Sequence, residues 1–184
     1  MMPKVRNIRW KISFSYLVYI LLFLLFVGIL SNLIIREQFK IYAKNRQNNH
    51  IKHILSEISN QYVESWNIKN IELIGKHEID NGYIISVYDK NKEIVWRALD
   101  ENHLHCIMVL EEIKGRMFSH HANWNGELIT EKFDLFVNDE KVGTLELSYI
   151  GPYFYTEEDF NFLLKLNTVY IASSIVFIFI ALIT

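Results

Sequence analysis

The side chains in this sequence that could do chemistry gather in one short segment. Imidazole, thiolate and thioether groups bind copper(I), zinc and related ions, and all three kinds occur here. The segment therefore indicates a candidate metal site. Its possible ligands are His103, His105, Cys106, His120 and His121, with Met108 and Met117 between them.

The spacing of these side chains also favours simpler explanations. His103 and His105 are two residues apart, so on a helix they do not share a face. If the segment is helical, the 17 residues from His103 to His120 span roughly 25 Å. Exposed histidines and core sulfurs explain the same pattern. The histidines could instead make the domain acid-sensitive, because imidazole titrates near neutral pH.

Other signatures of catalysis are absent from the sequence. The seven glycines never cluster, so there is no phosphate-binding loop. No nucleophile elbow and no H-E-x-x-H motif occurs. The acid pairs Glu111-Glu112 and Glu157-Glu158 fit a helix surface and a helix start. We therefore expect neither catalytic residues nor a cofactor in this chain.

Two apolar runs must position everything between them. The run 12–35 contains no charged residue, and its 24 residues form about 36 Å of helix, enough to cross a bilayer. It is too long for the core of a cleaved signal peptide. A second run, 167–184, has no basic residue after it. We expect transmembrane helices at both, the second one truncated.

The distribution of charge suggests an orientation. Residues 1–11 carry four basic residues and no acid, which favours a cytoplasmic N-terminus in a multi-pass protein of the cell membrane. All 21 acids lie between Glu37 and Asp159. Such an acidic middle segment, 36–166, argues against binding nucleic acid. The lone cysteine excludes an internal disulfide.

The middle segment predicts an α+β domain. Helical spacing continues from Arg36 to near Glu64 and returns at 102–120. Two β-hairpins are predicted by β-branched or alternating runs around polar turns. A helix start is predicted at Thr156, followed by three acids. The expected order is a long helix, possible short turns at 71–78, strands 83–88 and 93–97, a helix, strands 133–137 and 144–149, and an exit helix. Antiparallel strands and helices in this order form a sheet of about four strands covered on one side.

The layout resembles the N-terminal sensor half of a bacterial two-component sensor histidine kinase, of the clostridial or bacillary kind with two membrane spans and a HAMP linker. The resemblance covers nearly the whole chain. It is carried by Ile8–Tyr16, by IISVYDKNKEIVW in the first hairpin, by Asn123-Trp124-Asn125-Gly126, and by Val142–Leu147 running into Gly151–Asp159.

This resemblance implies a PAS-like extracytoplasmic domain with a long N-terminal helix, an unknown extracytoplasmic ligand and a homodimer in contact with membrane lipid. It also implies a kinase core that uses ATP and magnesium and a cognate response regulator. No histidine here is followed by the Glu-x-x-x-Pro pattern of the phospho-acceptor box, so kinase activity would belong to a longer parent. The alternative is a stand-alone two-span membrane protein with a binding or accessory role and no enzymatic output, with or without a bound metal.

Overall fold

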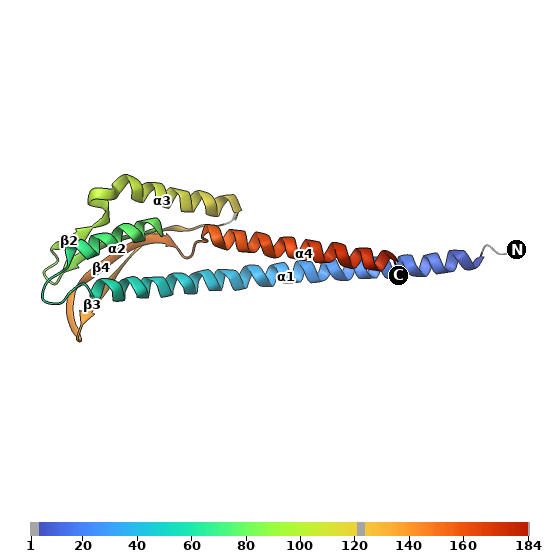
Figure 1. Cartoon of the computed structure of the whole chain (residues 1–184), viewed down its shortest axis with the longest axis horizontal. Coiled ribbons are helices and arrows are strands. Elements are labelled where there is room, and N and C mark those ends of the chain that lie inside the picture. The colour runs from blue at the N-terminus through green and yellow to red at the C-terminus, as the bar shows by residue number, and fades with distance from the viewer. Residues whose placement is uncertain (1–3, 121–123, 184) are drawn as a thin grey trace. The chain divides into compact units, whose positions relative to one another are not determined.

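The computed structural model describes residues 4–120 and 124–183. The chain divides into two compact units, one formed by Met1–Lys40 with Glu157–Thr184 and the other by Ile41–Thr156. Figure 1 labels the helices and strands along the chain. Helix α1 (Lys4–Ser59) belongs to both units, because it is continuous through residue 40.

The second unit is built on a four-stranded antiparallel sheet in the order β2-β1-β4-β3. The central strands β1 and β4 pair from Tyr83 opposite Tyr149 to Asp89 opposite Gly143. In this register alternate side chains of the two strands share one buried face. The strands are β1 (Tyr83–Asp89), β2 (Ile94–Arg97), β3 (Glu127–Val137) and β4 (Glu140–Gly151).

Both hairpin turns follow from their polar residues. The Asp89 carboxylate accepts hydrogen bonds of 2.8 Å from the backbone N–H groups of Asn91 and Glu93. In the β3–β4 turn, Asn138 and Asp139 have φ angles of 51° and 63°. Two successive positive φ angles match the twist of the flanking strands, and Asn and Asp tolerate them.

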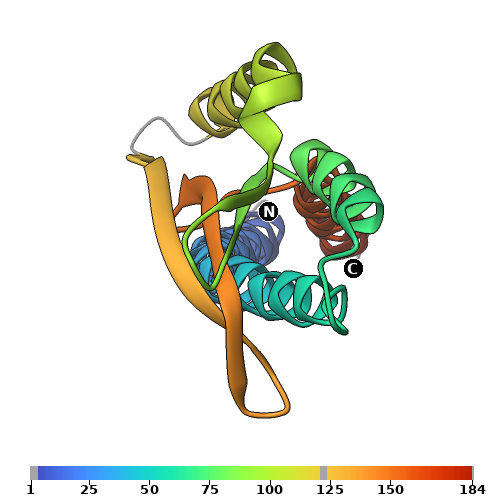
Figure 2. The ribbon, with the colours of Figure 1, turned by 90° about the vertical axis from the view of Figure 1, so that its left-hand side faces the viewer.

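Helix α2 (Ile68–Asp80) lies on the same side of the sheet as residues 41–59 of α1, which belong to the second unit (Figure 2). The Asn67 side chain caps α2 by accepting a 3.2 Å hydrogen bond from the N–H of Asn70. Gly75 faces the Trp96 ring so closely that a Cβ would overlap it. This position therefore requires glycine.

Helix α3 (Ala98–His120) packs against α2 and the sheet. It has a break in its helical geometry at Asn102. Met117 is fully buried, and its sulfur accepts a hydrogen bond from the backbone N–H of Tyr155. After this break, the buried side of α3 has helical spacing and consists of Cys106, Leu110, Ile113 and Met117.

The first unit consists of the N-terminal part of α1 and α4 (Glu157–Ile183). Two helical segments, Phe14–Ser59 and Glu157–Ile180, are long and apolar enough to cross a membrane. Their most apolar stretches are not buried within the protein. The first turn of α4 carries three acids, whose charge favours a helix N-terminus.

The α+β class, the antiparallel four-stranded sheet and the long N-terminal helix are confirmed. The element bounds differ from those predicted. Helix α1 ends at Ser59 instead of near Glu64, and α2 is a full helix rather than one or two turns. Helix α3 begins four residues earlier, at Ala98, and β3 begins at Glu127 instead of 133. The longer β3 pairs with β4 along its whole length, although its alternation is weak before Phe133.

Candidate functional site

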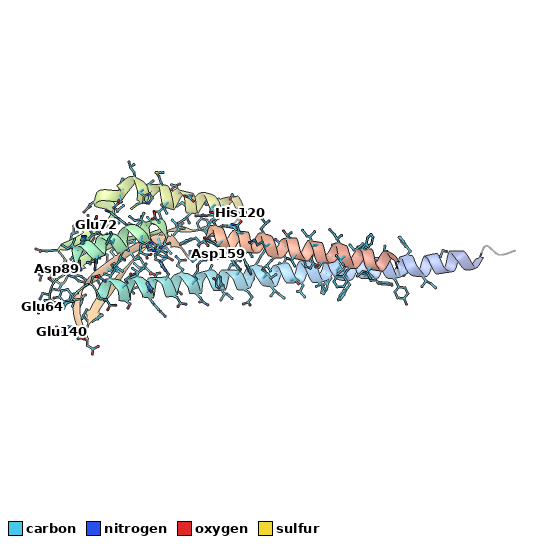
Figure 3. The ribbon with its side chains drawn as sticks, in the orientation of Figure 1. Glu64, Glu72, Asp89, His120, Glu140 and Asp159 are labelled. Carbon is cyan, nitrogen blue, oxygen red and sulfur yellow. The ribbon has the colours of Figure 1, made fainter. Side chains whose placement is uncertain are left out.

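The structure separates most of the side chains predicted as metal ligands. Cys106 is buried in the core, whereas His103 and His105 are exposed. The His105 ring nitrogen lies 2.7 Å from a carboxylate oxygen of Asp80 at the end of α2. Figure 3 shows His120 at the far end of α3.

His121 lies outside the described residues. Within residues 4–120 and 124–183, no three His, Cys, Asp or Glu side chains form a group that could hold a metal ion. Burial raises the pKa of the Cys106 thiol, which disfavours the thiolate that a metal requires. The five-residue metal site stays a prediction, and the described geometry favours core sulfur and surface histidines.

A different polar cluster joins three elements of the α+β domain. His50 of α1 lies with its Nε2 atom 2.6 Å from the Glu78 carboxylate of α2. Glu78 is only 2% exposed. The His50 ring also packs on the ring of Tyr83 from β1, with 4.8 Å between centroids. We call His50, Glu78 and Tyr83 the α1 junction.

Burial controls the electrostatics around the α1 junction. It raises the pKa of Tyr83 well above the usual range, with Glu78 adding to the rise and Arg46 opposing it. The neighbouring Tyr149 donates a 3.0 Å hydrogen bond to Glu131. Burial, followed by this carboxylate, raises the pKa of Tyr149 to about 12. Both phenols therefore stay neutral at physiological pH.

Two further side chains of α1 bind the end of β4 and the segment after it. Arg46 donates a 3.0 Å hydrogen bond to the carbonyl oxygen of Phe154. Gln47, 4% exposed, donates a 3.2 Å bond to the carbonyl oxygen of Ile150. Ile150 lies near the end of β4, and Phe154 lies in the segment that follows it. The same stretch of α1 therefore contacts α2, β1 and the exit of β4.

In the first unit, helices α1 and α4 contact each other at two places. The Tyr170 hydroxyl of α4 donates a 2.7 Å hydrogen bond to the carbonyl oxygen of Leu24 in α1. Gly28 makes this approach possible, because a Cβ there would overlap the hydroxyl. Near the other end, the rings of Phe39 and Phe162 stack with centroids 6.0 Å apart. These contacts set the register of α4 on α1.

Comparisons with models of protein families, with curated proteins and with solved structures find no match to this chain.

Reasoning from the sequence missed the α1 junction, because His50 and Glu78 lie 28 residues apart. One signal was available. The buried side of α2 consists of Ile71, Gly75, Glu78 and Ile79, and this spacing places an acid on an apolar helix face. A buried acid needs a partner, but nothing in the sequence identifies His50 as that partner.

Proposed function

We propose that this chain is the membrane-bound sensing part of a two-component sensor histidine kinase. In this proposal the α+β domain is a PAS-like extracytoplasmic domain, α1 and α4 cross the cell membrane, and the N-terminus is cytoplasmic. The signal is an extracytoplasmic ligand. The output is the activity of a kinase core in a longer parent, which binds ATP and magnesium and phosphorylates a response regulator.

One observation carries the proposal. Helix α1 is continuous from Lys4 to Ser59, so the apolar run 12–35 and the helix inside the α+β domain are parts of one helix. A helix without a break transmits translation and rotation along its axis. A displacement of the domain end of α1 would therefore reach the apolar end.

The α1 junction supports the same function. Its His50–Glu78 pair attaches α1 to α2, and the Tyr83 ring attaches it to the central strand β1. A ligand that binds two arrangements of the domain unequally would shift the balance between them. Because α1 makes polar contacts with both α2 and the sheet, such a shift would move α1.

The proposed assembly is a homodimer in which the long entry helices of two copies lie side by side. Membrane lipid surrounds the apolar runs. Extracytoplasmic placement of the α+β domain agrees with the basic, acid-free residues 1–11, which favour the cytoplasmic side.

The first test of this proposal is the nucleotide sequence beyond the codon for Thr184. It should encode HAMP helices and then an H-E-x-x-x-P box. A stop codon there would refute the proposal that this chain is part of a histidine kinase. Reporter fusions after residues 11 and 156 test the orientation, and activity of an extracytoplasmic reporter is expected only from the second.

The coupling role is tested in the parent kinase by phosphorylation of its response regulator. His50→Ala should change basal phosphorylation, because it detaches α1 from Glu78. His53→Ala is the matched control, since His53 lies on the same helix with its side chain 69% exposed. Equal outputs from the two variants would contradict signalling through the α1 junction.

A further inference from the structure

A groove runs along one side of the α1–α4 helix pair in the first unit. Its volume is about 520 Å³, within the range of roughly 300–1,000 Å³ typical of ligand pockets. Most of its wall is aliphatic, as expected for a surface that faces lipid tails. The residues that matter here are Leu25, Ile29, Asn32 and Arg36 from α1, with Ile171 and Ile175 from α4.

The two polar side chains at one end of this groove have no partner among the described residues. Asn32 and Arg36 are both exposed, and neither makes a hydrogen bond or ion pair within residues 4–120 and 124–183. An amide below headgroup level is costly unless something satisfies it, and a guanidinium at headgroup level attracts anionic groups. The groove therefore offers donors and a positive charge to an occupant.

We propose that this groove binds one anionic glycerophospholipid. Its phosphate pairs with Arg36, an ester oxygen accepts a hydrogen bond from Asn32, and an acyl chain lies along Ile29 and Ile171. This inference requires that α1 and α4 cross a membrane, and is independent of any kinase output.

The spacing along α1 fits such a lipid. Arg36 is the first charged residue after the apolar run 12–35, so it lies at headgroup level. Asn32 is four residues deeper, about 6 Å along the helix. This order places a cation beside the phosphate and an amide donor beside the ester level. The groove below them is mostly aliphatic, and its two hydroxyls, Tyr170 and Ser174, already donate to backbone carbonyls.

The charge of the groove disfavours a second copy of the chain as its occupant. In a parallel two-fold dimer formed through this face, equivalent residues would face each other. The two copies of Arg36 would then approach in a low-dielectric setting, and the residues lining the groove include no acid to neutralise them. An anionic lipid headgroup supplies the missing negative charge.

The test uses the full chain in nanodiscs of phosphatidylcholine containing a photoactivatable phosphatidylglycerol with its reactive group in the acyl chain. Resistance to alkaline extraction first shows that the chain is integral to the membrane. After photolysis, mass spectrometry should locate most cross-links on peptides that contain Ile29 and Ile171. Arg36→Gln should lower the phosphatidylglycerol yield, relative to a phosphatidylcholine probe, about fivefold.

Two variants distinguish lipid binding at this groove from a general attraction of anionic lipid to basic residues. Lys165→Gln is the matched control, because Lys165 is exposed on α4 but does not line the groove. It should leave the yield unchanged, and Arg36→Lys should retain most of it. Equal losses in Arg36→Gln and Lys165→Gln would overturn the proposal.

A second copy in the groove is the competing outcome. In the variant Ile29→Cys, oxidation would then join two chains by a disulfide. The chain without this substitution, whose only thiol is the buried Cys106, is the control for this reaction. Efficient dimer formation by the variant, together with loss of lipid cross-links at the groove, would overturn lipid occupancy while leaving the proposed sensor function intact.

Discussion

Substitutions of His50 and Glu78, the two hydrogen-bonded members of the α1 junction, should have unequal effects on stability. Replacing His50 by alanine leaves the Glu78 carboxylate, whose side chain is 3% exposed, without its hydrogen-bond partner. Replacing Glu78 by glutamine leaves an imidazole whose side chain is 32% exposed and can bind water. His50→Ala should therefore lower the free energy of unfolding more than Glu78→Gln.

The expected magnitudes follow from the burial of each group. A hydrogen bond to a charged group is worth roughly 1.5–3 kcal/mol, and a buried unsatisfied group costs at least a similar amount. We expect His50→Ala to lower the free energy of unfolding by about 2–3 kcal/mol. Glu78→Gln should lower it by about 1 kcal/mol, because the amide can still hydrogen-bond to the imidazole. The double variant should show a coupling energy of about 1–2 kcal/mol.

Urea unfolding of the full chain in detergent micelles, followed by tryptophan fluorescence, measures these changes. Three of the four tryptophans, Trp66, Trp96 and Trp124, lie in the α+β domain. With an m-value of about 2 kcal/mol/M, the midpoint for His50→Ala should fall by about 1 M. His53→Ala is the control and should change the midpoint little, since the contact of His53 with Glu57 is exposed.

Two results would refute this reasoning. The first is a His50→Ala midpoint no lower than that of His53→Ala. The second is strict additivity of His50→Ala and Glu78→Gln, which would mean that the 2.6 Å contact contributes no coupling.

Three other predictions concern separate parts of the molecule. Gly28→Ala should loosen the pairing of α1 with α4, because its Cβ overlaps the Tyr170 hydroxyl; cysteine cross-linking between the helices measures this, and Tyr170→Phe should give a smaller effect. The raised pKa of Tyr149 means that the folded state holds this proton more tightly, so stability should fall as pH rises from about 10 towards 12, and Tyr149→Phe should flatten part of that fall. Cys106, 1% exposed and with a raised pKa, should react with thiol reagents much more slowly than a free thiol until the domain unfolds; fast labelling of the native chain would contradict its burial.

The parts of the fold that depend on local chemistry could be predicted from the sequence. The Asp89 turn and the Asn138-Asp139 turn encode their hairpins in adjacent residues. The apolar run 12–35 similarly indicates a long helix by itself. Short-range signals of this kind require no knowledge of which residues meet across the fold.

The parts that depend on tertiary contacts could not be predicted. The length of β3 follows from its pairing with β4, and residues Glu127–Lys132 show little alternation of their own. The α1 junction requires knowing that His50 and Glu78 meet. Proximity in the sequence suggested a metal site at His103 and Cys106, but helix geometry exposes one and buries the other.

The position of β3 at the edge of the sheet has a consequence for aggregation. An edge strand of eleven residues presents unpaired backbone groups that could recruit a strand from another molecule. Four charged residues interrupt it, namely Glu127, Glu131, Lys132 and Asp134, and its register shifts between Leu135 and Phe136. Charges and irregular pairing both discourage growth of a sheet between molecules. Neutralising these charges would expose a template for intermolecular β-structure, and at Glu131 it would also weaken the hydrogen bond from the Tyr149 hydroxyl.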